Sequence, residues 1–185
     1  MYLMTCTCPD LAYPLGLLAR YVAPGRHRKV HMHAAKKILR YLCSTWGMGL
    51  VLGGRGDVVL TGHSDASWVD DQTTQRSSLG YTFSLGSGSV SWRSTRSSSV
   101  LGSSCEAKIY ATAMAHLPTY RLGREASFSS SSLQQRGQLR LTYVATRANS
   151  ADIFTKALLP GDHQRFCTLL GLVPTLPHLL LLCTS

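Results

Sequence analysis

The chain has 185 residues, enough for one ordinary domain or for a small domain with an added fragment. Its 19 Lys and Arg against 9 Asp and Glu give a formal net charge of +10, which favours a polyanionic partner, most simply nucleic acid, although a merely basic surface is the alternative. The sequence lacks a signal-peptide pattern and an apolar run long enough to span a bilayer, and its six cysteines are scattered. We therefore expect an intracellular protein, cytoplasmic or nuclear, that is neither secreted nor in contact with a membrane.

The first 57 residues have helical periodicity. A first helix is expected after Thr7, with Pro14 as a kink inside it. A second helix is expected from about His27 to Leu42, with a buried face of Ala34, Ala35, Ile38, Leu39 and Leu42. Its basic residues are Arg28, Lys29, Lys36, Lys37 and Arg40. They form either a solvated face or a nucleic-acid contact, and the sequence does not decide between the two.

From Asp57 onward the period becomes that of strands. Three strands are expected, at 58–64, 79–85 and 89–94, the last two joined by a glycine-rich hairpin turn. A helix should begin at Ser103 and end before Pro118. Residues 121–137 are serine-rich and lack periodicity, which predicts a flexible loop.

Beyond this loop the pattern changes again. A strand is expected at 138–145, where apolar and polar residues alternate. A helix capped by Asn149 or Ser150 should run to about Leu158. A last helix should run from Asp162 to Leu170, and the tail after Pro174 has no clear pattern. The order of elements indicates a mixed α/β sheet with helices on its faces.

Two segments carry the chemistry, and their sequences are Gly62-His63-Ser64-Asp65-Ala66-Ser67-Trp68 and Asn149-Ser150-Ala151-Asp152-Ile153-Phe154-Thr155-Lys156. The first ends a strand with a carboxylate, and the second starts a helix with another. Taken alone, Asp65 would be a turn residue and Asp152 a complement to the helix dipole. Together with Ser103-Ser104-Cys105-Glu106-Ala107-Lys108-Ile109-Tyr110, however, these segments resemble the ribonuclease H domain of copia-type retrotransposon polyproteins.

The N-terminal part resembles the end of the preceding reverse transcriptase domain. The similar segments are Met1-Tyr2-Leu3-Met4-Thr5, Thr7-Cys8-Pro9-Asp10-Leu11-Ala12-Tyr13 and Lys37-Ile38-Leu39-Arg40-Tyr41-Leu42. Cys8 departs from the family, which has an arginine at that position. The resemblance covers roughly residues 1 to 172.

The resemblance implies Mg²⁺-dependent cleavage of RNA in RNA–DNA hybrids, with carboxylates converging on the metal ions. It assigns Asp65 and Asp152 as remnants of the catalytic and metal-binding set. The helix glutamate of the family falls on Lys108, and the aspartate of its fourth strand has no counterpart here. Glu106 is a doubtful substitute, because Ser103 and Glu106 have capping-box spacing and residues two apart on a helix point in different directions. We expect the Lys108 ammonium to lie between Asp65 and Asp152 and to exclude Mg²⁺.

The expected fold is a ribonuclease H-like mixed sheet with flanking helices and a truncated central part, preceded by a small helical segment. The expected division is a reverse transcriptase remnant at 1–57, a ribonuclease H-like domain at 58–158, and a C-terminal helix with an apolar tail at 159–185. The expected partner is an RNA–DNA hybrid or another nucleic acid. Cleavage should be impaired, and two alternatives remain: a non-enzymatic basic remnant that binds nucleic acid, or a decayed reading frame without a selected role.

Overall fold

The computed structural model describes residues 2–26, 28–53, 59–121 and 142–175, with the side chains of 116–121 left undescribed. The helical elements are α1 (Tyr2–Cys6), η1 (Pro9–Leu11), α2 (Ala12–Ala19), α3 (Lys29–Ser44), α4 (Ser104–Arg121), η2 (Thr146–Ala148), η3 (Ser150–Phe154) and α6 (Pro160–Leu169). The strands are β1 (Met48–Leu50), β2 (Leu60–Asp71), β3 (Arg76–Leu85), β4 (Gly88–Arg96) and β5 (Leu172–Pro174). This is a mixed α/β architecture with antiparallel sheets and flanking helices, compatible with a ribonuclease H-like fold.

The main sheet is an antiparallel meander in the order β2-β3-β4. The three strands predicted at 58–64, 79–85 and 89–94 are confirmed as β2, β3 and β4, and each is longer than its periodicity indicated. Asp65 lies opposite Gly80 in the β2–β3 register. Asp65 therefore lies in the middle of β2 rather than at the end of a strand.

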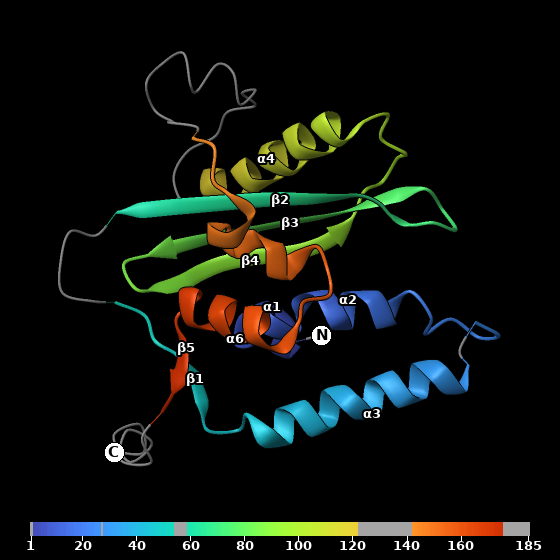
Figure 1. The fold of residues 1–185 in the computed structure, drawn as a ribbon, viewed down its shortest axis with the longest axis horizontal. Helices are drawn as coiled ribbons and strands as arrows, with labels where there is room; N and C mark the ends of the chain where they lie inside the picture. The colour runs from blue at the N-terminus through green and yellow to red at the C-terminus, as the bar shows by residue number, and fades with distance from the viewer. Residues whose placement is uncertain (1, 27, 54–58, 122–141, 176–185) are drawn as a thin grey trace.

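Helix α4 lies along one face of this sheet (Figure 1). The core on that face contains Leu79, Leu101, Ala107 and Ala111. On β2, the Oγ of Ser64 lies 3.1 Å from Oγ1 of Thr112, so Ser64 points toward α4. Because successive strand residues point to opposite faces, Asp65 points away from α4.

The other face is covered by η3, by α6 and by the N-terminal helices α1 and α2 (Figure 1). Trp92 on β4 donates its indole N–H to the carbonyl of Met4, and Ser94 donates to the carbonyl of Phe154. The core of this face consists of Ala12, Ala151, Ile153, Phe154, Phe166, Cys167, Leu170 and Leu172. It therefore joins residues from the beginning and the end of the chain.

A second, two-stranded sheet pairs β1 with β5 in antiparallel fashion. Strand β5 was not predicted from the sequence. Gly171 precedes β5 with a φ of 86°, and a Cβ there would lie 2.7 Å from the Cα of Gly88. A glycine is therefore needed where the chain turns from α6 toward β5 and passes the β3–β4 hairpin.

Several expected elements differ in the structure. Helix α3 has no fully buried residue, and Leu39, expected in the core, is 61% exposed. Residues 142–145 are not in a strand, and Tyr143 is 90% exposed, because no neighbouring strand pairs with this segment in the described part of the chain. The closing helix is the short 3₁₀ turn η3, which ends at Phe154.

Some expectations concern residues outside those described. They are the flexible loop near 121–137, nearly all of which lies within 122–141, the first half of the strand at 138–145, and most of the apolar tail. Among the helices that the structure describes, none combines the length and the apolar character that crossing a bilayer requires.

Candidate active site

The candidate active site lies on the face of the sheet opposite α4, where η3 packs over β2 and β3. Gly80 of β3 makes this close packing possible. A Cβ at Gly80 would lie 2.5 Å from the Cβ of Phe154 and 3.0 Å from Cγ2 of Thr155. Because Gly80 is paired with Asp65, the same contact brings η3 over Asp65.

Asn149 fixes the start of η3 against the sheet. Its side-chain oxygen accepts a hydrogen bond from the amide of Ala151 at 3.2 Å, so it caps the turn as the sequence predicted. Its Nδ2 donates to the carbonyl of Ser64 at 3.1 Å. One side chain therefore both starts η3 and attaches it to the strand residue that precedes Asp65.

Asp65 and Asp152 meet at this place, and Lys156 contacts both of them. The Lys156 Nζ lies 2.7 Å from Oδ2 of Asp152 and 3.8 Å from Oδ2 of Asp65. Thr155 donates its hydroxyl to Oδ2 of Asp65. The expected convergence of the two carboxylates is present in the structure.

The Asp152 side chain is only 3% exposed, while that of Lys156 is 37% exposed. Burial raises the pKa of the Asp152 carboxyl above its usual value of 3.8, and the nearby Asp65 raises it further, while Lys156 lowers it. The ammonium therefore compensates two carboxylates only in part.

Lys108 does not take the place expected for it. It lies on α4, across the sheet from Asp65, and its side chain is exposed. Within the described residues it forms no ion pair. The expectation that Lys108 bridges the two carboxylates is wrong, because the alternation along β2 points Asp65 away from α4.

The assignment of Glu106 to a helix cap is confirmed. The amide of Glu106 donates to Oγ of Ser103 at 3.1 Å, and the Glu106 carboxylate accepts from the amide of Gly102 at 2.6 Å. The carboxylate is therefore engaged at the start of α4 rather than directed toward Asp65.

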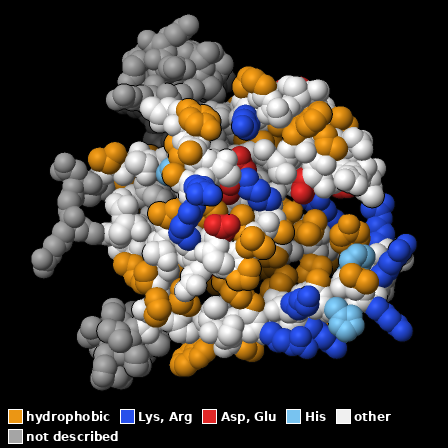
Figure 2. Space-filling model, in the orientation of Figure 1, with side chains coloured by type: hydrophobic (Ala, Val, Ile, Leu, Met, Phe, Trp, Pro, Cys, Tyr) orange, Lys and Arg blue, Asp and Glu red, His pale blue; other side chains and the backbone are white. Residues whose placement is uncertain are grey.

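The predicted basic residues Arg28, Lys29, Lys36, Lys37 and Arg40 are all exposed. Four of them lie on α3 and the fifth immediately precedes it, and α3 contains no acidic residue. Figure 2 shows Lys and Arg side chains gathered over α3. These side chains form a basic patch on one side of the molecule.

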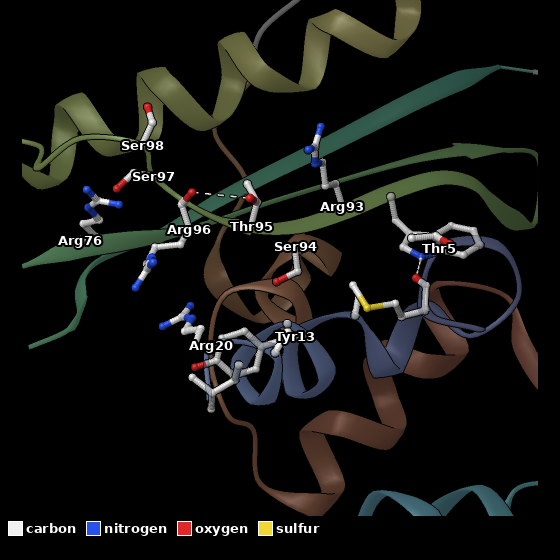
Figure 3. Close-up of a pocket in the computed structure, with 16 residues that line it drawn as sticks. Thr5, Tyr13, Arg20, Arg76, Arg93, Ser94, Thr95, Arg96, Ser97 and Ser98 are labelled. Carbon is white, nitrogen blue, oxygen red and sulfur yellow. Dashed lines mark hydrogen bonds between the residues drawn. The ribbon is translucent and has the colours of Figure 1, made fainter. Parts of the chain in front are cut away.

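A second charged group was not predicted from the sequence. Arg20, which directly follows α2, and Arg96 of β4 both pair with Asp71, at 3.7 and 2.9 Å, beside a cavity of about 560 Å³. Figure 3 shows Arg20 and Arg96 on one side of β4 and Arg93 on the other. Hydrogen bonds from Thr73 hold the pKa of Asp71 well below its usual range, so this carboxylate stays ionised and ties α2 to the sheet.

The chain is similar in sequence to several known proteins. The chain is 43% identical over 106 residues to the Secreted RxLR effector protein 161 of Plasmopara viticola, covering 57% of this chain and 73% of that protein. It is 37% identical over 145 residues to the Retrovirus-related Pol polyprotein from transposon TNT 1-94 of Nicotiana tabacum, covering 78% of this chain and 10% of the polyprotein. It is 27% identical over 211 aligned positions to the polyprotein from transposon RE2 of Arabidopsis thaliana, covering 92% and 14%.

This chain is a homologue of retrotransposon Pol polyproteins. It spans about a tenth of the length of the two polyproteins named above. No family model and no solved structure matches it.

Against this background, the residues at the site fit a two-metal centre poorly. Mg²⁺ takes hard oxygen ligands, and two ions that flank a phosphate need several carboxylates. In the described residues the site offers Asp65 and Asp152, and the ammonium of Lys156 lies within 4 Å of both. The main sheet, as described, has three strands, so the strand that carries the third carboxylate in the family resemblance has no equivalent there.

The sequence analysis missed Lys156 as a site residue. No role was predicted for it, although it stands four residues after Asp152 in the closing segment 149–156. The signal that could have identified it is the spacing itself. At that spacing Lys156 reaches Asp152, and Asp152 was already expected to lie beside Asp65.

Proposed function

We propose that this chain is a degenerate ribonuclease H-like domain of a retrotransposon polyprotein, which binds nucleic acid through its basic surface and does not cleave RNA in RNA–DNA hybrids. The observation that carries the proposal is the meeting of Asp65 and Asp152 on one face of the sheet under η3. These are the two residues that the sequence resemblance assigns to the catalytic set. An intracellular location, cytoplasmic or nuclear, is part of the same proposal.

The loss of cleavage follows from the charges at the site. Two carboxylates are compensated by one ammonium, and the helix position that carries a glutamate in the family carries Lys108. A dication that entered would have to displace Lys156 and would gain only two protein carboxylates. Lys156 belongs to the closing segment that resembles the family, so this lysine alone does not explain a loss of cleavage. The loss is explained by the carboxylates of the family that this site lacks.

The retained function is electrostatic. The basic side chains of α3 are exposed, and the helix has no acidic residue to neutralise them. Lys and Arg side chains that contact phosphates displace condensed counterions, which makes binding steeply dependent on salt. The proposed ligand is therefore a nucleic-acid backbone, read without sequence specificity.

The catalytic half is tested by incubating the full chain with a labelled RNA–DNA hybrid and Mg²⁺. We expect no cleavage above background for the unmodified chain. Lys108→Glu should also give no cleavage, because residue 108 lies on α4, across the sheet from Asp65, and a carboxylate there does not join the site. Mg²⁺-dependent cleavage by the unmodified chain that is lost in Asp65→Asn would overturn this half of the proposal.

The binding half is tested by fluorescence anisotropy on the same hybrid, with salt varied and without divalent ions. Lys36→Glu/Lys37→Glu should weaken binding and reduce the salt slope by about two, near one for each lost phosphate contact. The matched control is Lys108→Glu/Arg147→Glu, which makes the same charge change at exposed residues outside α3. Equal weakening in both variants would show that net charge alone, and not α3, governs binding.

A further inference from the structure

A largely buried cluster of polar side chains lies where α6 meets η1 and α3, away from Asp65 and Asp152. It brings together Asp10 of η1, Tyr41 of α3, and His163 and Cys167 of α6. Asp10 is 7% exposed and Cys167 is 4% exposed. A buried carboxylate and thiol beside a half-buried imidazole are costly to desolvate unless they share a partner, so their convergence from distant parts of the chain requires an explanation.

One ligand atom from each of Asp10, His163 and Cys167 lies within 4.8 Å of the other two. The Sγ of Cys167 lies 3.6 Å from Nδ1 of His163. A tetrahedral zinc ion with Zn–S of about 2.3 Å and Zn–N of about 2.0 Å holds its sulfur and nitrogen ligands about 3.6 Å apart. The thiol and imidazole therefore already have the separation that zinc requires.

The spacing of the ligands is also favourable. His163 and Cys167 are four residues apart on α6, so they project from the same side of the helix. A cavity of about 580 Å³ is lined by these two residues, by Asp10 and by Tyr41. It provides an entry path and room for a water molecule as fourth ligand.

Tyr41 supplies an outer contact. Its hydroxyl donates to Oδ2 of Asp10, and its ring lies edge-on to that of His163 with centroids 5.6 Å apart. This arrangement leaves Oδ1 of Asp10 to bind a cation and fixes the direction of the carboxylate. Hydrogen bonds of this kind orient metal ligands in zinc proteins.

We propose that Asp10, His163 and Cys167 form a zinc site that fastens α6 to the N-terminal helices. Sulfur, nitrogen and oxygen ligands in one tetrahedral set favour Zn²⁺ over Mg²⁺ or Ca²⁺, which take oxygen ligands. Burial and the nearby Asp10 raise the pKa of the Cys167 thiol to about 12 in the metal-free chain. Zinc takes the place of the thiol proton, which is released to water.

The test is titration of the reduced full chain with Co²⁺, which reports thiolate ligands by a charge-transfer absorption band, followed by displacement with Zn²⁺. We expect the band in the unmodified chain and its loss in Cys167→Ser. The matched control is Cys43→Ser, which removes an exposed thiol on α3 and should keep the band. A band that persists in Cys167→Ser, or no band in the unmodified chain, would overturn the proposal.

Two further variants guard against misfolding of Cys167→Ser. His163→Gln changes a half-buried residue and should also abolish the band while circular dichroism stays unchanged. Tyr41→Phe removes the hydroxyl that contacts Asp10 and Cys167 and should weaken the metal affinity about 10- to 100-fold. Zinc should raise the Tm of the unmodified chain and of Cys43→Ser but not that of His163→Gln, and equal rises in all three would contradict the site.

Discussion

The Lys156 ammonium lies 2.7 Å from Oδ2 of Asp152, four residues earlier in the chain, and this contact compensates a carboxylate that is almost fully buried. The pair differs from an ordinary surface pair in one respect. A second carboxylate, that of Asp65, shares the same ammonium at 3.8 Å. Removing the cation therefore leaves two negative groups facing each other.

Lys156→Met should destabilise the chain by about 1–2 kcal/mol at neutral pH, at the lower end for a buried charge because water screens the half-exposed ammonium. The raised pKa of Asp152 sets the pH dependence. Below pH 3.8 the carboxyl is protonated in both folded and unfolded chains, and above it the folded chain retains the proton longer, so stability falls as pH rises. The difference in urea midpoint between Lys156→Met and the unmodified chain should be larger at about pH 7 than at about pH 4.

The control for this prediction is the double variant Asp152→Asn/Lys156→Met. It removes the buried charge together with its partner and should recover part of the loss. A Lys156→Met effect that is the same at both pH values would show that the lysine acts through packing rather than charge.

His63 should make the fold sensitive to mild acid. Its Nδ1 is buried without a hydrogen-bond partner among the described residues, and burial lowers its pKa below the usual 6.5. The unfolded chain therefore takes up a proton below about pH 6.5 before the folded chain does, so stability is lost as pH falls through that region. His63→Leu should flatten this loss between about pH 7 and pH 5 in urea titrations. An unchanged slope would mean that His63 does not titrate differently on folding.

Ser103 should contribute measurably as a cap for α4. Its hydroxyl accepts from the amide of Glu106. Ser103→Ala should cost about 1 kcal/mol in free energy of unfolding. The control is Ser99→Ala, at an exposed position before the helix, which should change stability by less than about 0.5 kcal/mol. Similar effects of the two changes would contradict the capping role.

Cys167 should resist alkylation in the folded chain when no metal is added. Its thiol pKa is raised to about 12, so the reactive thiolate is scarce near neutral pH. Cys6, Cys43 and Cys105 are exposed and should react at least about a hundredfold faster with iodoacetamide. Peptide mapping by mass spectrometry over time measures the alkylation rate of each cysteine. In urea, which unfolds the chain, Cys167 and the exposed cysteines should react at similar rates. Rapid labelling of Cys167 in the folded chain would refute its burial.

The parts of the fold that could be predicted from sequence are those with a local signal. The meander β2-β3-β4 follows from period-two alternation and a glycine turn, and the start of α4 follows from the Ser103–Glu106 spacing. Asp65 and Asp152 were identified through the family resemblance. Their meeting depends on Gly80, whose missing Cβ lets η3 approach the sheet, and sequence periodicity carries no information on that contact.

The errors have a common physical origin in tertiary pairing. Strand β5 is three residues long and exists because β1 is beside it, so it has no pattern of its own. Residues 142–145 have the alternation of a strand but no neighbour to pair with in the described chain. Lys108 was placed by analogy with a glutamate position, whereas the pleat of β2 directs Asp65 to the other face.

Because β1 pairs with β5, the early segment 48–50 can complete its sheet only after residues near the end of the chain have been made. Residues 48–50 are held by residues 172–174, and Thr175 donates its hydroxyl to the carbonyl of Gly47. During synthesis the early segment leaves the ribosome long before its partner is made. A premature stop before Leu172 would therefore leave β1 without its partner strand as well as removing β5. Such a shortened chain should be less stable than the number of missing residues alone would suggest.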